Sequence, residues 1–226
     1  LGLLAVVTFI FVKDIKKVES EKQNETSDQK SIAQAPFSFS LKEYSHQFKV
    51  YLAAVFIFGL GVMPVALMLL KSKEIGLNGF SMPLMYFIYN LSFVIFAIPA
   101  GKLADRIGDK KVIAGGFLMG IFSYLNLAFF SSIPSVMLGF IIFGIYSAMT
   151  DGVERAFASK LVPAGKLASG QGFLNSAIGL SSLFAGLIGG SIWTVYGSKL
   201  ALIYGALMMI IGLLAFIHLH RHKEAV

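Results

Sequence analysis

One short stretch of the 226-residue sequence concentrates charge inside a chain that is otherwise apolar. It reads PAGKLADRIGDKK, runs from Pro99 to Lys111, and carries four bases and two acids within ten residues. Basic residues hold a loop on the cytoplasmic side of a membrane, but an acid contributes nothing to that placement. The informative residue is therefore Asp105, and the chemistry it offers is pairing with a base or with the positive N-terminal end of a helix.

A second charged group lies in the stretch DGVERAFASKLVP at 151–163. Asp151 and Arg155 are four residues apart, so they share one face of a helix and can pair. If these charges join Asp105 in one cluster, they can hold one conformation closed; the alternative is that they reach the membrane surface and only mark the end of a helix. The residues predicted to form this conformational gate are Gly101, Asp105, Arg106, Gly108, Lys110, Lys111, Asp151, Glu154 and Arg155.

The polar groups near the centres of the apolar stretches are uncharged. The predicted substrate-binding residues are Tyr86, Asn90, Tyr146 and Asn175. Asn90 lies close to the centre of 82–100, where an unpaired amide in lipid costs a few kcal/mol. Tyr86 is one helical turn away and can line a cavity with it. The alternative is that Asn90 makes a hydrogen bond between helices and touches no substrate.

Residues for catalysis or metal binding do not stand out. The four histidines are His46 and the alternating residues His218, His220 and His222, and there is no cysteine. The three C-terminal histidines could bind a metal weakly, but basic anchoring at the chain end is the simpler interpretation. No Ser/His/Asp set, metal cluster or glycine-rich phosphate loop is evident. We therefore predict no enzymatic activity, no cofactor and no metal.

The elements that must position these residues are membrane helices. The chain is 56% hydrophobic and 14% charged, whereas a soluble domain is about 45–50% apolar and about 25% charged. A bilayer core needs roughly 20 apolar residues of helix to span it. The sequence predicts an all-α polytopic membrane protein with six spans, at 50–70, 82–100, 112–130, 134–157, 168–192 and 199–219.

The remaining segments complete the predicted organisation. Residues 1–12 are apolar but too short to span a bilayer, so we interpret them as the end of a preceding transmembrane helix of a longer protein. Residues 13–49 are rich in Lys, Glu, Ser and Gln, a composition that buries too little apolar surface to fold alone. We predict that they form a cytoplasmic linker, that 50–219 form the six-helix domain, and that 220–226 form a cytoplasmic tail.

The distribution of positive charge predicts the orientation of the chain. Sixteen of the 19 Lys and Arg residues fall in the linker, the 101–111 loop, the region after Asp151 and the C-terminal tail. The positive-inside rule places these segments in the cytoplasm. The net charge of +7 is thus explained by membrane orientation, and we predict no nucleic-acid partner.

An internal repeat supports an inverted arrangement of helices. Gly101, Gly108 and Lys110 share their spacing with a second set, Gly190, Gly197 and Lys199. The two sets follow the second helix of each predicted triplet and fall on opposite sides of the membrane. This pattern indicates two inverted three-helix repeats; the alternative is chance agreement in glycine-rich sequence.

The segment GKLADRIGDKK resembles the loop signature of the major facilitator superfamily. The matching positions are Gly101, Leu103, Asp105, Arg106, Gly108, Lys110 and Lys111. The resemblance implies the C-terminal half of that fold, preceded by the end of the sixth helix and a central linker. It implies a missing N-terminal six-helix half as partner, a lipid bilayer, and a small-molecule substrate carried by alternating access, in the plasma (inner) membrane of a bacterium. The alternatives are a non-transporting sensor or assembly partner and an inactive half-transporter.

Overall fold

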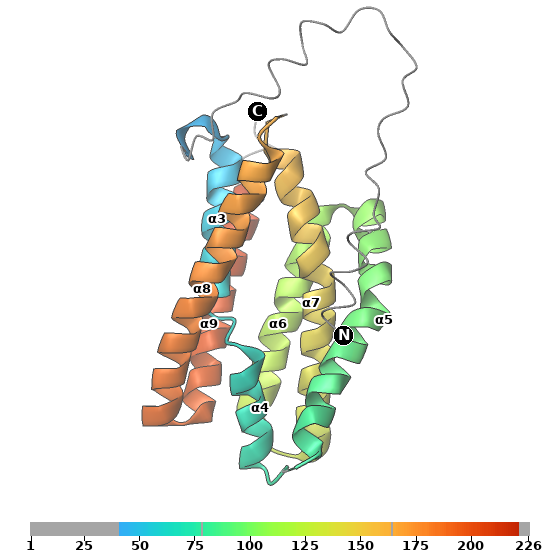
Figure 1. Ribbon diagram of the computed structural model, residues 1–226, viewed down its shortest axis with the longest axis vertical. Coiled ribbons are helices and arrows are strands. Elements are labelled where there is room, and N and C mark those ends of the chain that lie inside the picture. The colour runs from blue at the N-terminus through green and yellow to red at the C-terminus, as the bar shows by residue number, and fades with distance from the viewer. Residues whose placement is uncertain (1–40, 78, 164, 222–226) are drawn as a thin grey trace, which may run out of the picture. The chain divides into compact units, whose positions relative to one another are not determined.

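The computed structural model describes residues 41–77, 79–163 and 165–221. The predicted helix end at 1–12, most of the predicted linker and residues 222–226 lie outside this part of the chain. A short 3-10 helix precedes seven α-helices (Figure 1). They are η1 (Leu41–Glu43), α3 (His46–Gly59), α4 (Val65–Glu74), α5 (Ser81–Ile107), α6 (Asp109–Phe129), α7 (Ile133–Leu161), α8 (Leu167–Tyr196) and α9 (Ser198–Arg221). This confirms the prediction of an all-α polytopic membrane protein.

Within the described residues, five helices are long and apolar enough to cross a membrane, namely α5, α6, α7, α8 and α9. The predicted first span, 50–70, is instead divided between α3 and α4. Pro64 has no N–H to donate to the carbonyl of Leu60, which favours a break in the helix at this point. The chain turns between Gly59 and Val65, and α4 then continues toward the other end of the bundle, where it packs against α5 (Figure 1).

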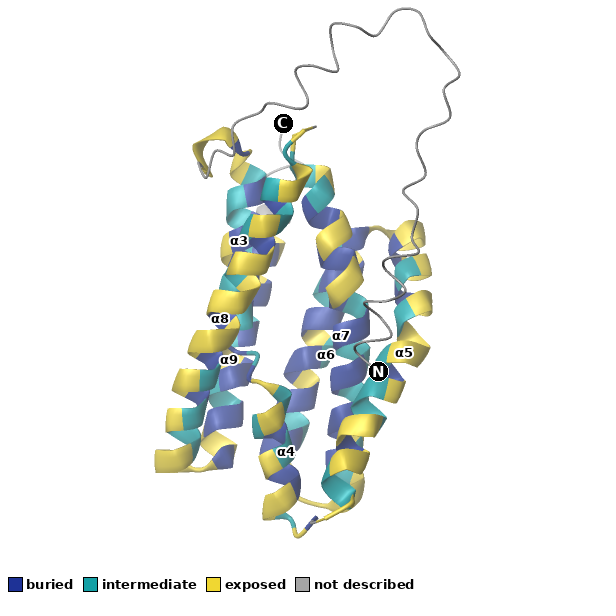
Figure 2. Ribbon diagram, viewed as in Figure 1, coloured by how far each residue is buried: buried dark blue, intermediate teal, exposed yellow. Residues whose placement is uncertain are grey.

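The helices differ in how much of their surface the bundle covers. About half of the residues in the membrane-length stretches of α6, α7 and α9 are buried, against 17% for α5 and for α8. α6 packs against α7 and α9, and α5 packs mainly against α7. Figure 2 shows the resulting pattern, in which α5 and α8 carry long exposed faces.

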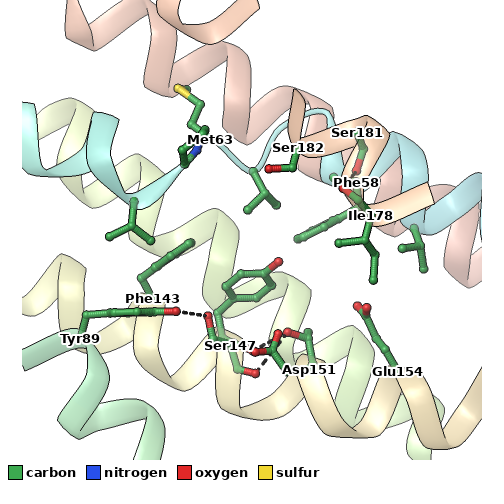
Figure 3. A pocket seen from close by; sticks show the side chains of 17 residues that line it. Phe58, Met63, Tyr89, Phe143, Ser147, Asp151, Glu154, Ile178, Ser181 and Ser182 are labelled. Atoms are coloured by element: carbon green, nitrogen blue, oxygen red, sulfur yellow. Dashed lines mark hydrogen bonds between the residues drawn. The ribbon is translucent and has the colours of Figure 1, made fainter. Parts of the chain in front are cut away.

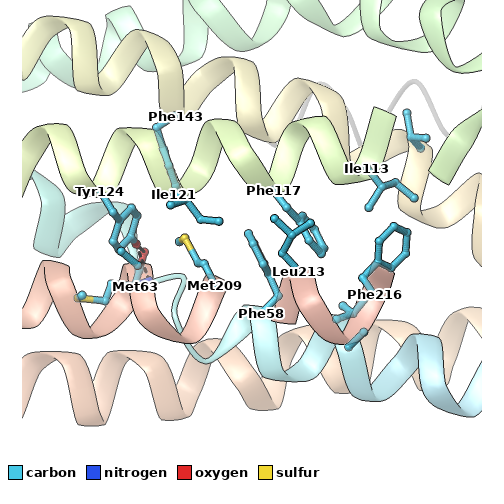
Figure 4. Packing of buried hydrophobic residues seen from close by; sticks show 14 of the residues in the cluster. Phe58, Met63, Ile113, Phe117, Ile121, Tyr124, Phe143, Met209, Leu213 and Phe216 are labelled. Atoms are coloured by element: carbon cyan, nitrogen blue, oxygen red, sulfur yellow. Dashed lines mark hydrogen bonds between the residues drawn. The ribbon is translucent and has the colours of Figure 1, made fainter. Parts of the chain in front are cut away.

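Aromatic rings from α3, α6 and α9 form the centre of the packed core (Figure 4). The rings of Phe58 and Phe117 are stacked, with centroids 3.6 Å apart, and Phe216 lies 5.6 Å from Phe117. α9 approaches α3 closely because it presents Gly212 there. A Cβ at that position would lie 2.5 Å from the backbone Cα of Phe58.

The break between α3 and α4 is fixed in place by α6. The hydroxyl of Tyr124 accepts a hydrogen bond from the backbone N–H of Met63 at 2.7 Å, and its oxygen lies 3.4 Å from the Met63 carbonyl. Tyr124 is fully buried. A backbone that leaves helical geometry inside a membrane needs such partners, because lipid offers none.

A buried polar contact fixes the other end of α4. The Lys71 ammonium donates to Glu74 at 3.2 Å and to the hydroxyl of Ser198 at 3.1 Å. Ser198 in turn donates to the same Glu74 carboxylate at 2.6 Å. This network joins the end of α4 to the start of α9, so α4 is held at both of its ends.

Two glycines at opposite ends of the bundle have the same conformation. Gly108, between α5 and α6, has φ 94° and ψ 143°; Gly197, between α8 and α9, has φ 88° and ψ 167°. Each donates its N–H to the residue four positions earlier at 2.9 Å. Left-handed φ values favour glycine. The equivalence of these turns supports the inverted repeat predicted from the glycine spacing.

Candidate functional site

A pocket of about 270 Å³ opens beside the break between α3 and α4 (Figure 3). It lies among the end of α3, the start of α4, and the inward faces of α5, α7 and α8. Its lining residues are Val55, Phe58, Gly59, Val62, Met63, Pro64, Val65, Tyr89, Phe143, Tyr146, Ser147, Thr150, Asp151, Glu154, Ile178, Ser181 and Ser182. The pocket thus combines an apolar, aromatic wall with a polar strip.

The polar strip comes mostly from one face of α7. Ser147, Asp151 and Glu154 are separated by four and three positions, so they lie on the same side of the helix. From α5, the hydroxyl of Tyr89 lies 3.3 Å from that of Ser147, within hydrogen-bond distance. From α8, Ser181 and Ser182 face the strip across the pocket (Figure 3).

Glu154 is the most unusual residue of the pocket. It is only 8% exposed. Its backbone carbonyl accepts a hydrogen bond from Tyr51 at 3.1 Å. Its carboxylate has no hydrogen bond or ion pair with any residue that the structure describes. Neighbouring Asp151 is exposed and equally unpaired within the described chain, although Arg155 lies four residues further along the helix.

The structure separates the predicted substrate-binding residues. Tyr146 lines the pocket, with its ring 5.7 Å from that of Phe58. Tyr86 is 48% exposed, and the Asn90 amide donates to the Tyr86 carbonyl at 2.7 Å within α5. Asn175 is exposed on α8. Only Tyr146 of the four belongs to this pocket, and their roles remain predictions.

The predicted gate residue Asp105 lines a different cavity, a groove of about 470 Å³ between α5 and α7. Most of its lining residues form two rows, each with residues at steps of four. The rows are Phe93, Ala97, Gly101 and Asp105 on α5, and Ala148, Gly152, Ala156 and Lys160 on α7. No atom outside the local backbone lies within 4 Å of a Cβ built on Gly101 or Gly152, so the groove is open between the rows.

An ion pair that the sequence did not reveal forms part of the wall of the groove. Asp109, which is 9% exposed, accepts a hydrogen bond from Lys160 at 2.6 Å. Both residues lie in the two charged stretches of the sequence, but their 51-residue separation hides the contact. The carboxylate of Asp105 has no such partner among the described residues.

The structure does not bring the predicted charges into one cluster. Glu154 and Asp151 line the pocket, whereas Asp105 lines the groove, and neither cavity includes Arg106 or Arg155. Gly108 forms the turn after α5, and Lys110 lies 5.7 Å from the ring of Phe157. α7 therefore carries two separate polar surfaces, one toward each cavity.

The described residues contain no group of three or more His, Cys, Asp or Glu side chains placed to hold a metal ion. The pocket itself offers the chemistry of the side chains that line it. It consists of two carboxylates, several hydroxyls and four aromatic rings.

Comparison with known proteins identifies the family. A sequence model of the Major Facilitator Superfamily matches residues 50–226. The chain belongs to this superfamily. An uncharacterized MFS-type transporter of Methanocaldococcus jannaschii is 30% identical over 93% of the chain, which spans 53% of that relative. The class B tetracycline resistance protein of Escherichia coli is 33% identical over 58% of the chain, which spans 33% of that protein.

Solved structures support the same fold. The human organic anion transporter MFSD10 superposes with a TM-score of 0.63 at 16% identity, over 96% of this chain and 46% of that one. An auto-inhibited POT-family peptide transporter gives the same TM-score at 17% identity, over 78% of this chain and 37% of that one. These findings confirm the predicted superfamily, and the chain spans about half or less of each of these four proteins.

Proposed function

We propose that this chain is one half of a secondary transporter that moves a small solute across a membrane by alternating access. The main support for the proposal is the pocket beside the broken α3–α4 segment. Irregular backbone within a membrane is tolerated where it lines a cavity, and discontinuous helices commonly form transport sites. The polar strip of α7 gives this cavity groups that can recognise a solute.

The exposed faces of α5 and α8 support a partner half. Both helices flank the pocket, and both are far less buried than α6 and α7. A second six-helix half, preceding this one in the full-length protein, would cover these faces and close the pocket from the other side. We place the assembly in the plasma (inner) membrane of a bacterium, with the linker and C-terminus in the cytoplasm.

We further propose that the groove around Asp105 is the conformational gate. Its rows of small residues leave room for a helix to approach closely. Its unpaired carboxylate can bind a base or the positive end of that helix. If that helix binds in the groove in one conformation and leaves it in the other, opening of the cytoplasmic side would be coupled to opening of the pocket.

Transport by the full-length protein in proteoliposomes tests the proposal. Radiolabelled cationic, neutral and anionic solutes would be offered with and without a pH gradient, with protein-free liposomes as control. We expect saturable flux of at least one solute above the control. Absence of flux for every solute, by protein that binds none of them in detergent, would favour a non-transporting membrane component.

A further inference from the structure

The charge of the pocket wall determines which kind of solute the pocket can bind. Two carboxylates, those of Asp151 and Glu154, line it, and its lining contains no Lys, Arg or His. The break contributes the carbonyl end of α3 at Gly59 and the N–H end of α4 at Val65, so its backbone dipoles largely offset each other. The described wall is therefore negative overall.

Glu154 is the residue that needs a partner. The residue is only 8% exposed, and no described residue donates a hydrogen bond to its carboxylate, which faces the pocket. A buried unpaired charge is strongly unfavourable unless a group of opposite charge or a donor comes to it. Figure 3 shows its side chain extending from α7 into the pocket, on the side where Ile178 lies. A ligand in the pocket can supply that partner.

The remaining wall suits a cation with an apolar body. The rings of Phe58 and Tyr146 lie 5.7 Å apart, and those of Phe143 and Tyr146 lie 5.2 Å apart. Aromatic faces attract cations, most strongly where water is excluded. The hydroxyl oxygens of Ser147 and Ser182 add uncharged acceptors. An anion would meet two carboxylates on this wall, and Arg155, whose charge acts on both of them, does not line the pocket.

We propose that the pocket selects a small organic cation, an amine or quaternary ammonium with an apolar body, and that Glu154 is its counter-charge. This inference rests on the proposed function, because it assigns the pocket as the solute site. Asp151, exposed one turn earlier on α7, would raise the local concentration of cations at the pocket. Phe58 and Tyr146 would hold the apolar body.

A matched pair of ligands tests whether the pocket prefers a positive or a negative solute. Benzyltrimethylammonium and phenylmethanesulfonate share a benzyl group and a tetrahedral head of opposite charge. We expect the full-length protein in detergent to bind the cation saturably by calorimetry, and to bind the anion at least ten times more weakly. Equal binding, tighter binding of the anion, or no binding of the cation would overturn the inference without any mutation.

Substitutions then test whether binding of the cation depends on Glu154. We expect Glu154→Gln to weaken binding of the cation about tenfold or more, since removal of a charge-assisted contact is costly in a dry site. Glu154→Asp keeps the charge and should retain part of the affinity. Glu43→Gln makes the same chemical change outside the pocket and should leave binding unchanged. Wild-type affinity in a well-folded Glu154→Gln protein would remove Glu154 from the site.

Flux measurements distinguish a failure of the cation site from a failure of the proposed transport function on which it rests. Transport of anionic or neutral solutes alone would keep the transporter and overturn the cation inference. Glu154-dependent binding of benzyltrimethylammonium without flux of any solute would keep the cation site and overturn transport. Saturable flux of the cation that falls in Glu154→Gln would support both.

Discussion

The phenol oxygen of Tyr124 lies 2.7 Å from the backbone nitrogen of Met63 and joins α6 to the turn between α3 and α4. Met63 and its neighbour Pro64 also line the pocket. The same contact that satisfies the broken backbone therefore sets the position of the pocket wall. The Tyr124 hydroxyl therefore links the packing in the centre of the bundle to the wall of the candidate site.

Removing that hydroxyl should destabilise the fold measurably. Tyr124→Phe keeps the ring but leaves the Met63 N–H with only its 3.1 Å contact to Gly61. We expect a loss of about 1–2 kcal/mol in the free energy of unfolding, measured by SDS titration in mixed micelles. Tyr196→Phe, at a residue that is 67% exposed, is the matched control. Equal stability of both variants would show that the bond contributes nothing.

Close packing of α9 on α3 gives a second prediction. Gly212→Ala would place a methyl group 2.5 Å from the Cα of Phe58, where only backbone movement can relieve the overlap. We expect a loss of about 1–3 kcal/mol, measured by the same titration. Gly179→Ala on α8 meets nothing within 4 Å and should be neutral or slightly stabilising. A neutral Gly212→Ala would mean that α3 and α9 are not packed this tightly.

Hydropathy was sufficient to predict the helical membrane fold, because five spans are uninterrupted apolar runs. It could not reveal that 50–70 holds two helices, since the residues of the α3–α4 turn are as apolar as the helices that flank it. A proline such as Pro64 interrupts helical hydrogen bonding, but the extent of the break depends on partners from distant segments, namely Tyr124 and Gly205. A Cβ on Gly205 would lie 2.7 Å from the Tyr124 ring.

The site was less predictable than the fold for a related reason. Helical spacing places Asp151 and Glu154 near one face of α7, but it does not say what that face meets. The residues of α3 and α8 that complete the pocket lie more than 20 positions from Glu154 in sequence, so the spacing within α7 does not reveal that Glu154 lines the pocket and not the groove around Asp105. The positions of Tyr86 and Asn90 near a membrane midplane likewise left open which face of α5 looks inward.

The orientation of the chain can be tested because its 226 residues contain no cysteine. Lys102→Cys lies in the loop predicted to be cytoplasmic, and Lys73→Cys lies at the opposite end of the bundle; both positions are exposed. In intact cells we expect a membrane-impermeant maleimide to label Lys73→Cys and to spare Lys102→Cys until the membrane is opened. The reverse pattern would contradict the positive-inside assignment.

Asp105 gives the prediction that bears most directly on mechanism. Asp105→Asn removes the charge from the groove but keeps its size, so membrane insertion should be normal while transport slows. A carboxylate at the end of a helix is worth about 0.3–1 kcal/mol, so the balance between conformations should shift by up to roughly fivefold. Asp105→Glu keeps the charge and should retain more of the flux.

A thiol in the groove can report that shift directly. Nothing lies within 4 Å of a Cβ on Gly152, so Gly152→Cys should react freely whenever the groove is empty. If a helix binds beside Asp105 when the cytoplasmic side is closed, combining Asp105→Asn with Gly152→Cys should speed labelling of this cysteine by up to roughly fivefold. Unchanged labelling together with wild-type flux would show that Asp105 is a surface charge with no part in gating. Slower flux with unchanged labelling would place its effect outside the groove.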